Sequence, residues 1–150
     1  MGYRIGICDD ERSQAQGLRD MTEAWARERG LSCRTELFPS AEAFLFACTE
    51  DSTFDILLLD VEMPGMTGID LAKTLRRENS RVQILFVTSH FELAGEGYEV
   101  DALHYLIKPV AREKLFSVLD KAAQKLAEEP PHVLISCQGE RVKLYESDIL

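Results

Sequence analysis

The chain alternates between short apolar runs and longer amphipathic segments. Five apolar runs predict β-strands, and they cover residues 3–8, 32–38, 54–59, 82–87 and 103–107. Run 54–59 is so continuously apolar that we expect both faces of its strand to be buried, whereas the half-polar run 32–38 predicts an edge strand. Regular alternation of this kind is typical of an α/β fold, in which helices cover a parallel sheet.

The segments that follow these runs predict five helices from the spacing of their apolar positions. Ser13 and Gln16 have the spacing of a capping box at the start of the first helix, and Gly30 stands where that helix should end. Thr67 and Asp70 are placed to cap the third helix. The ends of these helices are therefore predicted from local sequence alone.

The fourth helix, expected over residues 91–100, is the weakest of the five. Gly95 and Gly97 lie inside it, and each glycine costs about 1 kcal/mol relative to alanine in a helix interior. We therefore expect this segment to be mobile or irregular. The last helix, in contrast, presents one apolar stripe, formed by Leu115, Val118, Leu119, Ala122 and Leu126.

The alternating pattern stops after the last helix. Pro130–Pro131 follows, and residues 132–145 predict a β-hairpin with its turn near Gly139. An isolated hairpin is only marginally stable in water, so we expect these residues to begin a larger β-rich unit. The predicted organisation is a first domain over 1–129, then a linker and the beginning of a second domain over 130–150.

Composition narrows the classes of function. The chain carries 26 acidic and 17 basic side chains, a formal charge of −9, which disfavours nucleic-acid binding by these residues. No apolar stretch reaches the length of a membrane span, and the first residues turn acidic too early for a signal peptide. The cysteines stand far apart in apolar runs and are expected to be core residues: Cys8, Cys33, Cys48 and Cys137. Together these features predict a cytoplasmic protein with no membrane partner.

Charged or polar side chains stand where four of the five runs end. Asp9 and Asp10 follow the first run, Asp60 the third, Thr88 the fourth and Lys108 the fifth. Because ligands bind beyond the carboxyl ends of parallel strands, we expect these side chains to meet at one rim of the sheet. Three crowded carboxylates repel one another and become tolerable around a hard cation. The pattern therefore predicts a Mg²⁺ site.

The same set of side chains is suited to phosphoryl transfer. A carboxylate beside Mg²⁺, here Asp60, can accept a phosphoryl group, and it needs no general base because it is already ionised at pH 7. Lys108 adds a positive charge, and the Thr88 hydroxyl adds a hydrogen-bond donor. Each residue alone has an ordinary structural interpretation, as a helix N-terminus, a turn or a strand end. Their occurrence together at successive strand ends favours the functional interpretation.

As a set, these motifs resemble the receiver domain of a two-component response regulator. The resemblance rests on Asp9–Asp10, the run LLDVEMPGMTG at 58–68, the residues FVTS at 86–89 and YLIKP at 105–109. It implies a flavodoxin-like (βα)5 fold over 1–129, with a five-stranded parallel sheet in the order 2-1-3-4-5 and helices on both faces. It also implies a signalling domain rather than an enzyme.

The resemblance assigns roles to the residues at the strand ends. Asp60 becomes the phosphoacceptor, Lys108 the phosphate partner, Thr88 the switch hydroxyl and Tyr105 the switch aromatic. The implied Mg²⁺ ligands are Asp9, Asp10, Asp60 and the backbone carbonyl of Glu62. The family usually also has a cis peptide bond before the proline of its Lys-Pro pair, here Pro109.

A narrower resemblance concerns the output of the protein. Residues 90–105 are similar to the receivers of LytTR-type transcription regulators, and residues 133–150 resemble the first strands of their DNA-binding domain. The resemblance implies a sensor histidine kinase as partner. It also implies phosphorylation-dependent homodimerisation through the face of the fourth helix, fifth strand and fifth helix. DNA would be contacted only by the part of the second domain that is missing from this sequence.

Two alternatives stay open from the residues alone. A Mg²⁺-dependent phosphatase of the haloacid-dehalogenase type also uses an aspartate nucleophile. That class needs a second aspartate where Glu62 stands, and its nucleophile follows the first strand, whereas Asp60 ends the third. The other alternative is a receiver-like binding module that acts without phosphorylation.

Overall fold

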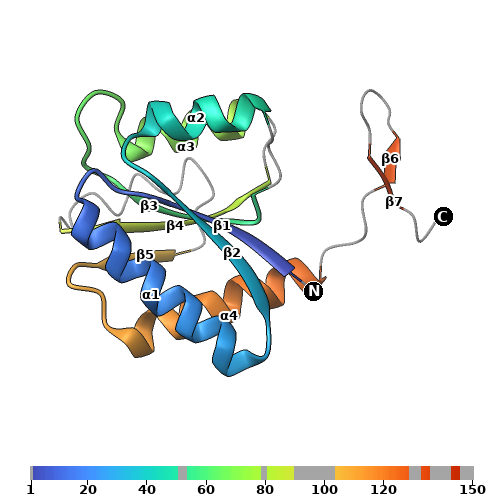
Figure 1. The fold of residues 1–150 in the computed structure, drawn as a ribbon. Coiled ribbons are helices and arrows are strands. Elements are labelled where there is room, and N and C mark those ends of the chain that lie inside the picture. Colours follow the sequence, from blue (N-terminus) through green and yellow to red (C-terminus); the bar gives the residue numbers. More distant parts are fainter. Residues whose placement is uncertain are drawn as a thin grey trace.

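The centre of the molecule is a five-stranded parallel sheet in the order β2-β1-β3-β4-β5 (Figure 1). The computed structural model describes residues 2–50, 54–78, 81–89, 104–128, 133–135 and 143–145. The strands are β1 (Gly2–Cys8), β2 (Ser32–Phe38), β3 (Ile56–Asp60), β4 (Gln83–Thr88) and β5 (His104–Ile107). The predicted fold class and strand order are confirmed, including the edge position of the half-polar strand β2.

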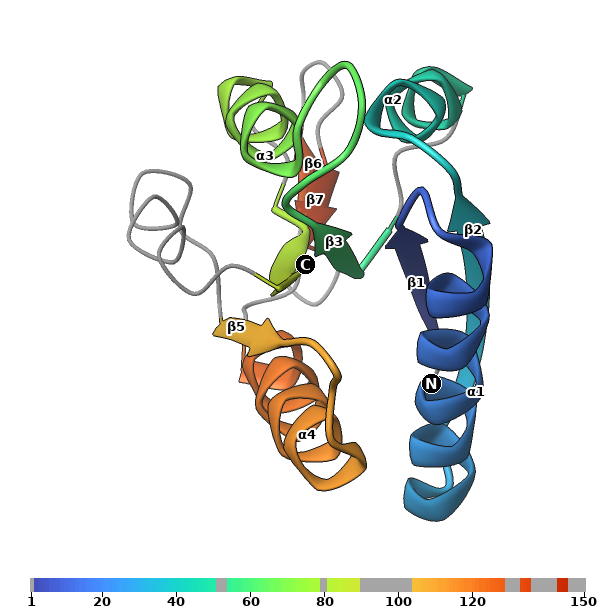
Figure 2. The same ribbon diagram turned by 90° about the vertical axis from the view of Figure 1, so that its left-hand side faces the viewer.

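Helices cover both faces of this sheet. Two helices, α1 (Arg12–Arg29) and α4 (Arg112–Glu128), lie on one face, while α2 (Ala41–Glu50) and α3 (Gly68–Arg77) lie on the other (Figures 1 and 2). The helix expected over residues 91–100 falls outside the described residues. Within the described part of the chain, no helix combines the length and apolar character needed to cross a membrane.

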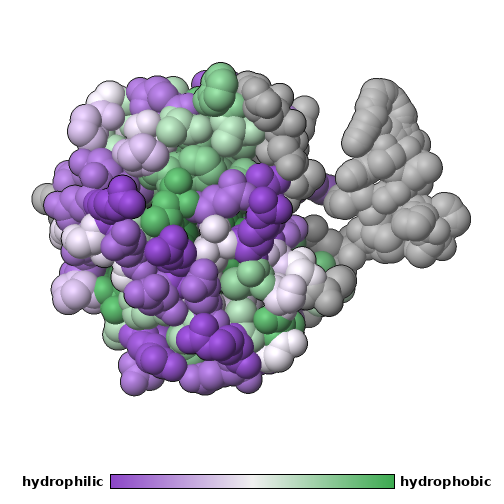
Figure 3. All heavy atoms as spheres, in the orientation of Figure 1, coloured by the Kyte–Doolittle hydropathy of each residue, from purple (hydrophilic) through white to green (hydrophobic). Residues whose placement is uncertain are grey.

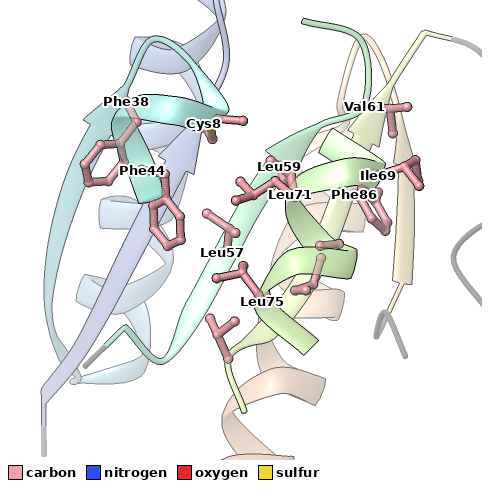
Figure 4. Close-up of a cluster of buried hydrophobic side chains, with 14 of the residues drawn as sticks. Cys8, Phe38, Phe44, Leu57, Leu59, Val61, Ile69, Leu71, Leu75 and Phe86 are labelled. Atoms are coloured by element: carbon pink, nitrogen blue, oxygen red, sulfur yellow. The ribbon is translucent and has the colours of Figure 1, made fainter. Parts of the chain in front are cut away.

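The core has two parts because side chains of a strand alternate between the two faces. In β3, Leu57 and Leu59 pack toward α2 and α3 (Figure 4). Ile56 and Leu58 pack toward α1 and α4. All five residues of β3 are buried, as its continuous apolar run predicts. Burying one such side chain is worth about 1.5–3 kcal/mol. This strand therefore fixes the position of Asp60, its last residue.

Two of the three predicted helix ends are confirmed. Gly30 ends α1 in the left-handed conformation, with φ 68°. Thr67 caps α3, since its Oγ1 accepts the Asp70 N–H at 3.1 Å and the Asp70 carboxylate accepts the Thr67 N–H at 3.5 Å. The capping box expected at Ser13 is wrong. The Asp9 carboxylate accepts the Glu11 N–H at 2.9 Å, so the chain turns into the helix before Ser13 is reached.

The described part of the carboxyl-terminal segment agrees with the predicted hairpin. Strands β6 (Val133–Ile135) and β7 (Lys143–Tyr145) pair antiparallel in a separate two-stranded sheet, as the hairpin prediction requires, while Gly139 and Cys137 lie outside the described residues.

Of the three described cysteines, Cys8 is a core residue, as predicted. The other two described cysteines are only half-buried, because they lie on the edge strand and near the end of α2: Cys33 and Cys48.

Candidate phosphoacceptor site

The strand ends bring three carboxylates together at one rim of the sheet. Asp9 and Asp10 follow β1, and Asp60 ends the neighbouring strand β3. One oxygen atom from each of the three lies within 4.8 Å of the others. Asp9 and Asp60 are buried, whereas Asp10 is exposed. The donor set is composed of hard carboxylate oxygens at a spacing that suits a small divalent cation.

Asp60 is held from several directions. Its Oδ1 accepts the Glu62 N–H at 3.2 Å, and its Oδ2 accepts a hydrogen bond from Lys108 Nζ at 3.3 Å. The backbone of α3 begins directly against Asp60, because a Cβ atom on Gly68 would collide with the carbonyl oxygen of Asp60. The Gly68 N–H donates to the Val61 carbonyl at 2.9 Å. The first residue of α3 thus fixes the backbone on which the carboxylate stands.

Lys108 joins two of the carboxylates. Its Nζ donates to Asp9 Oδ2 at 3.1 Å as well as to Asp60, and its side chain is only 14% exposed. Lys108 directly follows β5, and its N–H donates to the Thr88 carbonyl at 2.9 Å, which places the lysine beside the end of β4. The peptide bond between Lys108 and Pro109 is cis, in line with the expectation from the resemblance.

Burial and charge set the protonation of this group. Burial and the charge of Asp9 raise the pKa of Asp60, Lys108 and the Glu62 N–H lower it, and together these effects bring it to about 6. For Lys108 itself, burial lowers the pKa, but its hydrogen bond to Asp9 and the nearby carboxylates outweigh burial and leave that pKa raised. The lysine therefore stays charged, and three carboxylates face one ammonium group. A divalent cation would balance this excess and favour ionised Asp60.

The carboxylates open into a hollow of about 440 Å³ at the surface. Its lining residues are Asp10, Glu11, Gln14, Asp60, Glu62, Ser89, Lys108 and Pro109. Sequence reasoning did not single out Gln14 or Ser89 as lining residues. Gln14 stands in the first turn of α1, four residues after Asp10, and this proximity to the predicted site residues was the available signal.

Two further residues of interest lie on adjacent strands. Thr88, the last residue of β4, is fully buried, and Tyr105 of β5 stacks on Phe86 with ring centroids 5.1 Å apart. In the parallel register Phe86 pairs with Tyr105, and Thr88 pairs with Ile107. Because Phe86 and Thr88 are two residues apart, they point to the same face of the sheet. Thr88 and Tyr105 are therefore neighbours across the strand pair.

Comparison with known proteins identifies the family. The model of the response regulator receiver domain matches residues 5–120. The chain belongs to this family. Phosphorylation-dependent switching is general among receiver domains, which take phosphoryl groups from histidine kinases and bind Mg²⁺ at an acidic pocket. It is a family of signalling domains rather than of catalytic enzymes.

Named relatives agree with this assignment. The positive alginate biosynthesis regulatory protein of Pseudomonas aeruginosa is 41% identical over 70 residues, which are 47% of this chain and 28% of that protein. The sensory transduction protein LytT of Bacillus subtilis is 39% identical over 71 residues, 47% of this chain and 30% of LytT. The matched part of the chain thus spans less than a third of either relative. LytT belongs to the type of regulator expected from the sequence.

A solved structure supports the fold. The response regulatory domain of protein mrkE from Klebsiella pneumoniae has a TM-score of 0.75 at 21% identity, and the match covers 85% of this chain and all of that domain. At this identity the likeness concerns the fold alone. The receiver fold expected from the strand-end motifs is confirmed.

Proposed function

We propose that this domain accepts a phosphoryl group on Asp60 from the phosphohistidine of a sensor histidine kinase and acts as a phosphorylation switch. The observation that carries the proposal is the surrounding of Asp60. Its carboxylate is buried on the protein side, lies within 4.8 Å of the Asp9 and Asp10 oxygens, contacts Lys108 and faces an open hollow. A phosphorylated side chain of a partner can enter that hollow from solvent.

The reaction we propose is a direct displacement at phosphorus. A carboxylate oxygen of Asp60 forms the new P–O bond while the P–N bond of the phosphohistidine breaks, and the imidazole leaves with the electron pair of that bond. Lys108, already hydrogen-bonded to the acceptor, is placed to bind an oxygen of the transferred group. Asp9 orients Lys108 through their hydrogen bond. No general base is required.

Mg²⁺ fits the residues at this rim. Asp9, Asp10, Asp60 and the backbone carbonyl of Glu62 would hold it, and the raised pKa of Asp60 reflects an excess of negative charge that a cation would relieve. When bound, Mg²⁺ supplies positive charge that offsets the charge of the phosphoryl group.

Thr88 and Tyr105 are our proposed switch pair. A phosphoryl group adds about −1.5 to −2 charge and recruits new hydrogen-bond donors, the Thr88 hydroxyl among them. A shift of Thr88 changes the packing next to Tyr105 and hence the face that includes β5 and α4. Such a switch is a shift of population between two packings. We propose homodimerisation of the cytoplasmic protein through this face as its output.

The output domain is a separate part of the proposal. Residues 1–129 form the receiver, and residues 130–150 contain a linker and the beginning of a β-rich, LytTR-like DNA-binding domain. The antiparallel pair β6 and β7 and the relatives LytT and the alginate regulator support this division. Paired receivers would bring two such domains onto DNA and so control transcription.

The test is the intact mass of the protein after incubation with Mg²⁺ and a small acyl phosphate. We expect a gain of one phosphoryl group that hydroxylamine removes, and no gain in an Asp60→Asn control. The absence of any gain in a protein that binds Mg²⁺ would contradict the proposal and favour a binding module that acts without phosphorylation. Size-exclusion chromatography of the phosphorylated protein and of a Thr88→Ala variant tests the switch.

A further inference from the structure

The loop between β3 and α3 is anchored by a residue of a different helix. Its outer part approaches α2 (Figure 2). In the first turn of α2, Glu42 Oε2 accepts the Met66 N–H at 3.1 Å. A charge-assisted hydrogen bond of this kind is stronger than a neutral one. Among the hydrogen bonds of the described residues, this is the contact that ties Gly65–Thr67 to another element.

Gly65, next to Met66, lies close to the same carboxylate oxygen of Glu42. It has φ 76°, in the left-handed region, and a Cβ atom at this position would lie 2.8 Å from Glu42 Oε2. The loop backbone and the carboxylate of Glu42 are therefore fitted closely together. A side chain at position 65 would displace the carboxylate in addition to straining the backbone.

This loop matters because both of its ends belong to the phosphoacceptor site. It starts at Asp60, continues through Glu62, whose N–H binds the acceptor carboxylate, and ends at Gly68, which packs on the backbone of Asp60. The inner end is held by the Gly68 to Val61 hydrogen bond of 2.9 Å. The outer arc of the loop, which includes Met66, is held by its hydrogen bond to Glu42.

We infer that Glu42 is a positioning residue for the phosphoacceptor loop, which it holds in the arrangement that binds Mg²⁺. The inference rests on the proposed function, in which the Glu62 carbonyl and the Asp60 carboxylate are metal ligands. Glu42 itself stays outside the ligand set and acts through the Met66 N–H. Its removal costs metal affinity because the free loop must be ordered when the cation binds.

The experiment is a calorimetric titration of the unphosphorylated chain with MgCl₂, followed by phosphorylation with a small acyl phosphate at low and saturating Mg²⁺. We expect Glu42→Ala to weaken Mg²⁺ binding by about 3- to 10-fold, a modest effect because the contact is exposed. Phosphorylation slows at low Mg²⁺ and recovers at saturating Mg²⁺. A change in rate that persists at saturation would overturn the inference.

Two variants separate the hydrogen bond from charge and from helix effects. Glu42→Gln keeps an acceptor oxygen, so we expect Mg²⁺ binding close to that of the wild type; an affinity as low as that of Glu42→Ala would assign the effect to charge and overturn the inference. Glu113→Ala removes an exposed acidic residue from the first turn of α4, on the opposite face of the sheet, and should leave Mg²⁺ affinity unchanged.

The Gly65→Ala variant completes the test. If Gly65 and Glu42 act through one contact, the double variant Gly65→Ala/Glu42→Ala loses less affinity than the sum of the single variants, and simple addition of the two losses contradicts the inference. Failure of the proposed function looks different. In that case the wild type binds Mg²⁺ but gains no phosphoryl group on Asp60, and the effect of Glu42 on Mg²⁺ affinity is still measurable.

Discussion

The two helical layers are attached to the molecule in different ways. In the α1–α4 layer, side chains join the helices to each other: Asp120 accepts hydrogen bonds from Trp25 Nε1 at 2.8 Å and from Arg29 Nε at 2.9 Å, and Arg112 Nη2 donates to Glu28 at 2.8 Å. In the α2–α3 layer, backbone meets backbone at Gly68 and Asp60. Substitutions between α1 and α4 should therefore change stability alone, and substitutions near the start of α3 should change stability and phosphorylation together.

The outer surfaces of the two layers differ as well. Hydrophilic residues predominate over α1, whereas the surface over α2 includes apolar residues (Figure 3). Phe46 of α2 is 70% exposed. Beneath α2, Phe44 packs edge-on against Phe38 with centroids 5.1 Å apart. The α2–α3 layer thus relies on apolar packing and close backbone approach, which tolerate changes of shape poorly.

The largest effect is expected from Gly68→Ala. The added methyl group meets the carbonyl oxygen of Asp60, which is backbone and cannot rotate away. We expect a loss of about 3 kcal/mol or more in the free energy of unfolding and a loss of phosphorylation, because the acceptor is displaced. Denaturant unfolding and intact mass measure the two effects. Wild-type stability, or full phosphorylation in the folded variant, would contradict the role of this backbone contact.

The next effect is expected from Asp120→Ala in the α1–α4 layer. The indole N–H of Trp25, a fully buried side chain, loses its acceptor, and we expect a loss of about 1–2 kcal/mol in unfolding free energy. Fluorescence of Trp25, the only tryptophan in the sequence, follows the unfolding. Asp120→Asn keeps an acceptor oxygen and should lose less. Phosphorylation should match that of the wild type in both variants, and a slower rate would break the proposed distinction between the layers.

The Asp60→Asn variant tests how much the charged carboxylate of Asp60 lowers the free energy of unfolding. The pKa of Asp60 is about 6 in the folded protein and has an ordinary value of 3.8, so between about pH 4 and 6 the folded state binds more protons than the unfolded state. Stability from this group therefore falls as the pH rises through that window. Without Mg²⁺, we expect Asp60→Asn to be more stable than the wild type by about 1 kcal/mol at pH 7.5, after allowance for screening by the open hollow.

The pH dependence is the control for that prediction. The advantage of Asp60→Asn should shrink as the pH falls through 6 and disappear below about pH 4, where the carboxyl group is neutral in both states. Adding Mg²⁺ at pH 7.5 should also reduce it, because the cation stabilises the wild type more than the variant. Melting temperatures recorded with and without Mg²⁺ measure both trends. An advantage that stays constant with pH would show that charge is not its cause.

The sequence allowed a prediction of the strands and of the rim because both depend on local patterns. Apolar runs such as 54–59 define the strands, and Asp60 and Lys108 attract attention as polar residues where such runs stop. Once the strands are parallel, their ends must meet. Most of the candidate site follows from this one geometric rule.

The remaining features depend on contacts between distant segments. In the sequence, Gly68 is one of several turn residues. Only the packing of α3 against β3 places it next to the backbone of Asp60. Glu42 is 24 residues away from Met66, and no local pattern pairs them. The capping prediction at Ser13 was wrong for a different, local reason, since the carboxylate of Asp9 accepts the Glu11 N–H two residues later and α1 begins at Arg12.

The smallest effect is expected from Gly17→Ala in α1, which makes the same exchange as Gly68→Ala but in the other helical layer. Gly17 lies in the interior of α1, and a Cβ atom there would meet nothing within 4 Å, in contrast to Gly68. Alanine favours the helix and restricts the unfolded chain, so we expect a gain of about 0.5–1 kcal/mol in unfolding free energy. Denaturant unfolding measures this gain, and the rate of phosphorylation should not change. If the same exchange of glycine for alanine altered phosphorylation here, as we expect it to do at Gly68, the α1–α4 layer would be coupled to Asp60, and the contrast between the two layers would be lost.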